Sequence, residues 1–389
     1  MSKIEPVLSN MPWNVKRNIV EAADTFTKLS IRQCSKEYKE HVDKSVTVYK
    51  EISLWCRSHA SKITMRLNID NINRIDLELE SRKHGYSKVR RVHRENNKVR
   101  RKKTYMRNGN YVEAAVGFAA KLFKRNVSFE AFQLGIVCIS GQYPPKYSRH
   151  KRTILGKLQE ALSARNQLLP VKEFRLYFDG VPEDINHVLP YLRPRTLKGI
   201  VLSITRTLDV LRQPQFSLDQ IAELVQWKQA KWLSLRGFHF SLPKEKYAHF
   251  EKIECFIGIL DINRVYEIFK DFRTNQNVRK CQIECHSCNH RSILEHCFKF
   301  NPRITVTTIT WLINSSEVEL MIDIPNNPNM LFKITMSQNA IKSVITFSKV
   351  RKGYQRRQIE QTVGLLRRVE QTVTVTAAEL MTDFHNYFH

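Results

Sequence analysis

The segment CQIECHSCNHRSILEHC, residues 281–297, holds the side chains best suited to metal chemistry. Cys285 and Cys288 are separated by two residues, and His290, His296 and Cys297 follow, so nitrogen and sulfur donors for a tetrahedral zinc site are present. A second closely spaced pair of Cys or His with a standard separation is missing from the segment. The spacing therefore fits a zinc site only in part.

The cysteines of this segment also have a purely structural interpretation. Cys281, Ile283 and Cys285 alternate as residues on one face of a β-strand do, and cysteine in such a position behaves as a small apolar residue. We favour this interpretation, and we expect neither a metal nor another cofactor.

A second candidate for chemistry is the basic stretch at residues 82–107. It contains twelve Lys or Arg and a single acidic residue, Glu95. Because like charges repel, this density predicts a solvated loop; it also suits a nuclear-import signal or nucleic-acid patch, or a contact for an acidic substrate or phosphoprotein. The candidate patch consists of Lys88, Arg90, Arg91, Lys98, Arg100, Arg101, Lys102 and Lys103.

The sequence lacks the common motifs of enzymes. The sequence has no G-x-G-x-x-G, no G-x-x-x-x-G-K-S/T, no G-x-S-x-G and no H-E-x-x-H, and its 12 glycines among 389 residues are too few for elaborate phosphate-binding loops. We therefore predict a non-catalytic protein with no catalytic residues.

The charge balance points to anionic partners. The 64 basic and 37 acidic residues give a net charge of +27, while 42% hydrophobic residues are ordinary for a globular chain. The first ten residues lack the apolar core of a signal peptide, and the most apolar helical run, residues 114–123, is short and contains Lys121. We expect a cytoplasmic or nuclear protein with reduced thiols and no membrane association.

The first part of the chain predicts three short helices. Pro12 suits a first helical turn, and Val15 and Ile19 follow on one face. Ile31, Cys34, Tyr38 and Val42 recur at spacings of three and four in the third helix. A unit of three short helices can bury little surface by itself. Its aliphatic side chains therefore either pack on the rest of the chain or contact a partner.

The remainder of the chain predicts an α/β fold (α+β overall). Residues 63–79 alternate apolar and polar side chains around a turn, which indicates a β-hairpin. Beyond residue 111, helical patterns at 152–166, 183–192, 217–230 and 261–272 alternate with candidate strands at 132–139, 172–178, 197–204, 231–238, 252–259, 280–286 and 303–310. The strand centres recur at about 26 to 33 residues, which favours an irregular leucine-rich-repeat-like solenoid over an open doubly wound sheet. Trp227 lies at helical spacing between apolar residues and is expected in the core.

Two segments resemble known families. Residues 8–43, LSNMPWNVKRNIVEAADTFTKLSIRQCSKEYKEHVD, resemble an F-box, although IR stands where LR is usual and the second helix is poor in Leu. HVLPYLRPRTLKGIVL at 187–202, IAELVQWKQAKWLSL at 221–235 and the stretch 322–344 are similar to the FTH domain, which follows the F-box in the nematode F-box A family. The implied domains are an F-box at 8–46, a β-hairpin and basic linker at 60–110, an FTH domain at 111–349 and a basic extension at 350–389.

The resemblance implies a function. An F-box docks on a Skp-type adaptor and through it on a cullin-RING ubiquitin ligase, while the FTH domain holds a protein substrate. By position, the adaptor-binding residues are Leu8, Met11, Pro12, Val15, Ile19, Leu29, Ile31, Cys34 and Tyr38. The alternative is a basic nucleic-acid-binding repeat protein without a ligase role.

Overall fold

A computed structural model describes most of the chain in two compact units. One unit comprises residues 1–206 and 223–230, and the other residues 207–222 and 231–389. Both are mixed α/β, as expected. The described residues are 12–23, 27–28, 31, 39, 42, 45–57, 62–81, 86–95, 98–107, 110–137, 145–178, 182–204, 218–237, 244–256, 267–268, 270–272, 275, 277–285, 306–311, 317–323, 329–338, 343–351 and 369–371.

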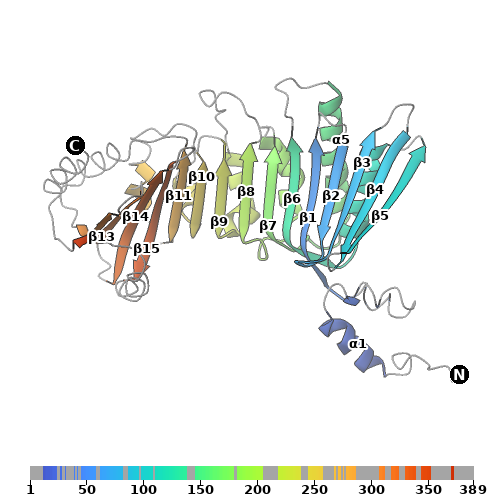
Figure 1. The fold of residues 1–389 in the computed structure, drawn as a ribbon, viewed down its shortest axis with the longest axis horizontal. Coiled ribbons are helices and arrows are strands. Elements are labelled where there is room, and N and C mark those ends of the chain that lie inside the picture. Colours follow the sequence, from blue (N-terminus) through green and yellow to red (C-terminus); the bar gives the residue numbers. More distant parts are fainter. Residues whose placement is uncertain are drawn as a thin grey trace. The chain divides into compact units, whose positions relative to one another are not determined.

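The sheet of the first unit has the strand order β8-β7-β6-β1-β2-β3-β4-β5 (Figure 1). Neighbours among β1, β6, β7 and β8 run parallel. Their bounds are β1 (Thr47–Arg57), β6 (Val127–Val137), β7 (Val171–Phe178) and β8 (Gly199–Ile204). The last three confirm predicted strands, whereas β1 was not predicted.

The outer half of this sheet is an antiparallel meander of β2 (Lys62–Asn68), β3 (Arg74–Ser81), β4 (Tyr86–Glu95) and β5 (Lys98–Arg107). The predicted hairpin is confirmed by β2 and β3. Its turn is closed by Asp70, whose side chain accepts hydrogen bonds from the backbone N–H groups of Ile72 and Asn73 at 2.7 and 2.6 Å.

The expectation of a solvated loop at the basic stretch is wrong, because most of it forms β4 and β5. The physical reason lies in the neighbouring strand β3, which supplies acidic side chains. Arg90 lies 3.6 Å from Glu78, and Arg94 lies 4.0 Å from Asp76. The like charges that were expected to repel are thus partly compensated once the strands pair.

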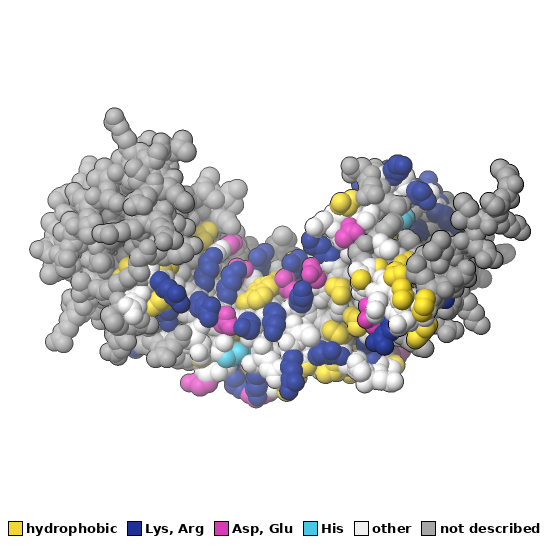
Figure 2. All heavy atoms as spheres, turned by 90° about the horizontal axis from the view of Figure 1, so that it is seen from below, with side chains coloured by type: hydrophobic (Ala, Val, Ile, Leu, Met, Phe, Trp, Pro, Cys, Tyr) yellow, Lys and Arg dark blue, Asp and Glu magenta, His cyan; other side chains and the backbone are white. Residues whose placement is uncertain are grey.

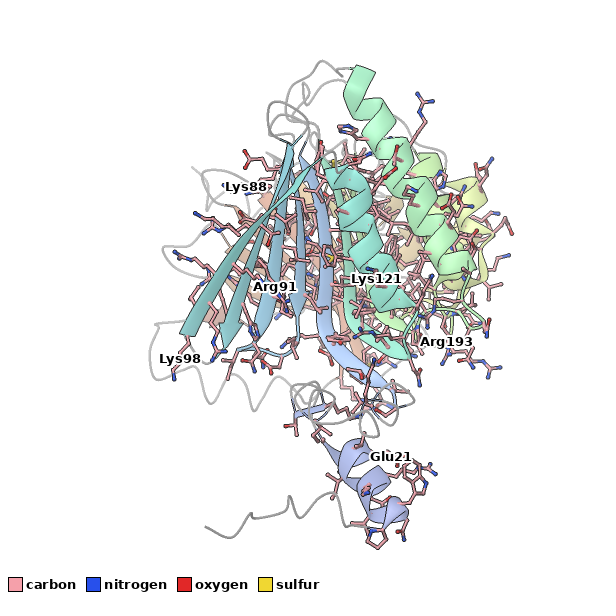
Figure 3. The ribbon with its side chains drawn as sticks, turned by 90° about the vertical axis from the view of Figure 1, so that its right-hand side faces the viewer. Glu21, Lys88, Arg91, Lys98, Lys121 and Arg193 are labelled. Carbon is pink, nitrogen blue, oxygen red and sulfur yellow. The ribbon has the colours of Figure 1, made fainter. Side chains whose placement is uncertain are left out.

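Helices α4 (Tyr111–Phe123) and α5 (Pro145–Ser163) lie on the same side of this sheet (Figure 3). Between helix and sheet lies an aromatic core. The ring of Phe123 on α4 is 6.1 Å from Phe129 and 5.6 Å from Phe132, and Phe132 is 5.8 Å from Phe174. Such fully buried rings contribute a large share of the apolar burial that holds α4 on the sheet.

Two predicted helices are interrupted. The segment 183–192 forms the 3₁₀ helices η4 (Pro182–His187) and η5 (Leu189–Tyr191) in place of one α-helix. Pro190 has no N–H to donate and sits in the first turn of η5, which breaks the helix there. The segment 217–230 forms two short helices, α6 (Asp219–Ala222) and α7 (Val225–Gln229), of which α7 belongs to the first unit.

The second unit has the strand order β16-β12-β13-β14-β15-β11-β10-β9. Strands β9, β10 and β11 pair in parallel, and β11 pairs antiparallel with β15. The predicted strands are confirmed, while the helix expected at 261–272 lies largely outside the described residues. The element bounds are β9 (Trp232–Arg236), α8 (Lys244–Tyr247), β10 (Lys252–Phe256), β11 (Lys280–Cys285), β12 (Val306–Trp311), β13 (Glu317–Asp323), β14 (Met330–Gln338), β15 (Ser343–Arg351) and β16 (Val369–Gln371).

At the N-terminal end, the structure describes one helix in full, α1 (Trp13–Ala22). The three-helix F-box expected here is not seen, because the segments of its other two helices lie mostly outside the described residues. Val20 of α1 is 1% exposed and belongs to a small apolar cluster with Val42 and Ile31. This segment therefore has its own small core.

Candidate binding surfaces

A cavity of about 540 Å³ opens between α4 and the outer strands of the first unit. Asn110 caps α4 by accepting a hydrogen bond from the backbone N–H of Val112 at 2.9 Å. The helix buries Val112, Ala115 and Val116 fully, while Phe118 remains 42% exposed at the cavity wall. We call this cavity the α4 groove.

Strand alternation gives the groove an apolar floor. Met65 and Leu67 of β2, Ile75 and Leu77 of β3, and Val89 of β4 all line it. Met65, Leu67 and Leu77 are buried under α4, whereas Ile75 and Val89 are only half-buried. Apolar surface thus stays accessible where the sheet extends past α4.

The rim of the groove is cationic. Along one row of the sheet Met65 is paired with Leu77, Leu77 with Arg91, and Arg91 with Lys102, so the row changes from apolar to basic toward β5. Lys121 and Arg125 line the helix side, and Figure 3 labels Lys121 on α4 and Arg91 on β4. Among the described residues that line the groove, no side chain is acidic.

The opposite face of the same strands is arranged differently. There Asp76 lies 2.7 Å from Arg66 and 3.3 Å from Arg74, and Glu78 lies 3.3 Å from Lys62. Both acids belong to β3 and ion-pair with side chains on its two neighbours. On one face of the outer strands the acids of β3 therefore compensate part of the charge. On the other face, in the groove, basic side chains accompany apolar ones.

The predicted basic patch is consequently not one site. Arg91, Arg100 and Lys102 lie on the groove face, because Arg91 is paired with Lys102 and His93 with Arg100. Arg90, Arg101 and Lys103 lie on the face of the β3 acids. By strand alternation, Lys88 lies on the same face as Arg90, and Lys98 lies on the same face as Lys102. Figure 3 labels Lys88 and Lys98.

A second basic cluster lies at the edge of the sheet where the parallel strands begin, and Lys and Arg side chains are frequent in this view (Figure 2). A cavity of about 350 Å³ is lined there by Lys124, Arg125 and Arg165. Arg165 donates to the carbonyl oxygens of Gln167 at 3.0 Å and Arg125 at 3.1 Å. Burial and then the nearby charge of Arg193 lower the pKa of Arg165.

The helix-free face of the first sheet carries an aromatic pair. The rings of Trp55 and Tyr177 are 5.0 Å apart and both are half-exposed. Gly135 of β6 lies between the two aromatic residues in the sheet, because it is paired with Trp55 of β1 on one side and with Tyr177 of β7 on the other. The missing side chain of Gly135 leaves the space in which the indole of Trp55 lies.

The predicted adaptor-binding residues are only partly described. Pro12, the N-cap residue of α1, and Val15 on the helix are exposed, and Trp13 is 53% exposed. Ile19 and Ile31 are half-buried. The other predicted members lie outside the described residues: Leu8, Met11, Leu29, Cys34 and Tyr38.

Polar contacts between distant segments stabilise the part of the first unit from α5 onward. Lys151 of α5 lies 2.6 Å from Asp184 of η4, with both side chains largely buried. The side-chain amide of Gln226 on α7 donates to the carbonyl oxygens of Pro190 at 2.8 Å and Leu192 at 2.9 Å. Trp227 beside it is fully buried, as predicted. The two segments that resemble known motifs, 187–202 and 221–235, thus touch through Gln226.

Comparison with family models matches this part of the chain to the FTH domain. Residues 152–303 form an FTH domain. The match begins within α5 and extends past β11, and lies inside the range 111–349 suggested by the sequence. An F-box is not detected by the same comparison. No curated protein and no solved structure matches the chain.

The described cysteines of the FTH domain, Cys255, Cys281 and Cys285, are buried in its core. Cys281 and Cys285 are buried and alternate with half-buried positions along β11. Burial raises the pKa of the Cys281 thiol well above its usual value. The remaining zinc-site candidates, Cys288, His290, His296 and Cys297, lie outside the described residues. Within the described part of the chain, no group of three or more His, Cys, Asp or Glu is placed to hold a metal.

None of the helices in the described ranges is long and apolar enough to cross a membrane.

The α4 groove was not predicted from the sequence. Alternation in 63–79 identified its floor as one face of a hairpin, but Phe118, Lys121 and Arg125 join that face only because α4 packs across it. No local pattern indicated that contact.

Proposed function

We propose that this protein is the substrate-recognition subunit of a Skp-cullin-F-box ubiquitin ligase. The FTH domain at residues 152–303 carries the proposal, because this domain follows an F-box in the family that the sequence resembles. In this proposal the FTH domain is built of leucine-rich-repeat-like strand-helix units and binds the target protein. The N-terminal segment docks on a Skp-type adaptor and through it on a cullin-RING ligase.

The exposed side of α1 supports a docking role. Val20 packs into the small N-terminal cluster, while Trp13 is 53% and Val15 37% exposed. Exposed aromatic and aliphatic side chains on a small helical unit are typical of a surface that a partner covers.

The mechanism would be positional and would use no catalytic residue or cofactor of this chain. Holding a target beside the ubiquitin-transferring subunits raises the effective concentration of its lysines. Such a receptor would act in the cytoplasm, the nucleus or both.

Co-purification with a Skp-type adaptor tests the docking role. Val15→Glu places a charge on the exposed side of α1 without disturbing its packed side, so we expect the adaptor to be lost. Asn18→Glu adds the same charge at another exposed position of α1 and should keep it. Retention of the adaptor by Val15→Glu, or no adaptor with the unaltered chain, would contradict the proposal.

Nucleic-acid binding is a second candidate, favoured by the row of cations along β5 and by the cluster around Arg165. Phosphate contacts release counterions, so the affinity for a short RNA or DNA duplex should then fall steeply with salt. A binding titration at two salt concentrations, with Arg165→Glu as the variant, separates this function from the receptor role.

A further inference from the structure

We propose that the α4 groove binds an acidic, aliphatic segment of a partner protein in the form of an amphipathic helix. This inference concerns a surface outside the FTH domain match and does not depend on docking to a ligase.

The first argument is that the described residues leave the groove side of the outer strands only partly covered. On this side of the sheet α4 packs over the buried residues Met65, Leu67 and Leu77. Beyond them Ile75 and Val89 stay half-buried, and Phe118 exposes 42% of its surface toward the same cavity. A helix of about 10 Å diameter laid beside α4 would bury these side chains as α4 buries its own part of the sheet.

The second argument is charge complementarity. Arg91 and Lys102 approach from the sheet, and Lys121 and Arg125 from the helix. In the described part of the chain, none of the four side chains has an acidic partner, whereas on the reverse face Arg66 and Arg90 pair with Asp76 and Glu78. A segment with carboxylates on either side of its aliphatic side chains would form ion pairs with the basic side chains of the groove, whereas a basic segment would be repelled.

The distribution of these groups favours a peptide over other anions. The cations lie on two opposite walls with aliphatic side chains between them, so one ligand must present several acids around an apolar stripe. A fatty acid carries a single carboxylate. A single-stranded nucleic acid requires aromatic surfaces on which its bases stack, and Phe118 is the one aromatic residue among the described lining residues.

A fluorescently labelled helical peptide of about four turns, with Leu on one face and Glu on the others, is the probe for a binding titration with the full chain. We expect binding in the range of about 1 to 100 µM. Lys102→Glu and the double variant Arg91→Glu/Lys121→Glu should weaken it, the double variant by about tenfold. These side chains are exposed, so the variants should fold.

Matched controls make the assignment specific to the groove. Lys103→Glu changes the net charge by the same amount as Lys102→Glu but lies on the reverse face of β5, so it should leave binding unchanged. Phe118→Ser should weaken binding, whereas Leu168→Ser, at a residue of similar exposure away from the groove, should not.

Three outcomes would overturn the inference. The first is no binding of the acidic peptide at about 1 mM. The second is equal loss for Lys102→Glu and Lys103→Glu, which would mean attraction by overall charge alone. The third is displacement of the peptide by oleate or by a short RNA, to the same extent from the unaltered chain and from Lys103→Glu, whose groove is intact; this would assign the groove to a lipid or a nucleic acid.

Discussion

Gln226 and Leu192 are joined directly: the side-chain amide nitrogen of Gln226 donates to the Leu192 carbonyl oxygen at 2.9 Å across 34 residues of sequence. The same nitrogen donates to the carbonyl oxygen of Pro190 at 2.8 Å. Gln226 is buried, so no water replaces it at these two acceptors without rearrangement. This contact connects α7 to the 3₁₀ helices that precede β8.

Removing that amide should destabilise the first unit. Gln226→Ala removes the donor from the buried Leu192 carbonyl oxygen and the part-buried Pro190 carbonyl oxygen, and should lower the free energy of unfolding by about 2 kcal/mol. Urea denaturation monitored by circular dichroism measures the change. Gln229→Ala, at an exposed position of the same helix, serves as the control and should change stability by less than about 0.5 kcal/mol. Equal effects of the two variants would show that the Gln226 contact does not stabilise the fold.

The buried ion pair of Lys151 and Asp184 should be sensitive to loss of one partner. Lys151→Met leaves the Asp184 carboxylate without its cation in a buried position and should cost about 3 to 5 kcal/mol. The double variant Lys151→Met/Asp184→Leu should recover much of that loss, because no buried charge is left. Lys172→Met breaks the exposed pair with Glu130 and should cost less than about 1 kcal/mol. Thermal unfolding of all three variants measures these losses, and Lys151→Met should show the largest.

Gly135 should not tolerate a side chain. A Cβ atom at this position would lie 2.6 Å from Cδ2 of Trp55 and closer still to its Cε3, so Gly135→Ala must displace the indole. We expect a loss of about 1 to 3 kcal/mol and a change in tryptophan fluorescence. Gly156→Ala in α5 meets no atom within 4 Å and should stabilise the protein by up to about 1 kcal/mol. A stable Gly135→Ala variant with unchanged fluorescence would contradict the packing described.

Stability should fall at alkaline pH. Burial raises the pKa of the Cys56 thiol to about 12, while a cysteine in an unfolded chain has a pKa of about 8.5. The unfolded chain therefore loses this proton first, and the stabilisation present at neutral pH decreases as the pH rises from about 9 toward 12, by about 1 kcal/mol per unit. Comparing urea midpoints at pH 8 and pH 10 measures it.

Cys56→Ala separates this titration from other alkaline effects. The variant is less stable at pH 8 because of the cavity it leaves, but it should lose less between pH 8 and pH 10 than the unaltered chain. Tyr111, whose pKa burial raises to about 12, adds to the loss above pH 10 in both proteins. An identical loss in the two proteins would exclude Cys56 as the cause.

The sequence alone determined much of the strand pattern. Alternation identified the hairpin of β2 and β3, and short apolar runs identified β6 through β12, because a buried strand requires such side chains whatever surrounds it. Cys281 and Cys285 were assigned to a strand core by the same alternation, and Trp227 to the core by its apolar neighbours.

Tertiary structure decided the features that depend on neighbours distant in sequence. Residues 86–95 and 98–107 form strands because Asp76 and Glu78 of β3 offset part of the charge, and no window within the basic stretch contains these acids. The α4 groove exists because Phe118 and Lys121 are brought over Leu77 and Arg91 by helix packing. Local patterns report which face of an element is apolar. Only the packed chain determines how much of that face is covered and which charges border what remains.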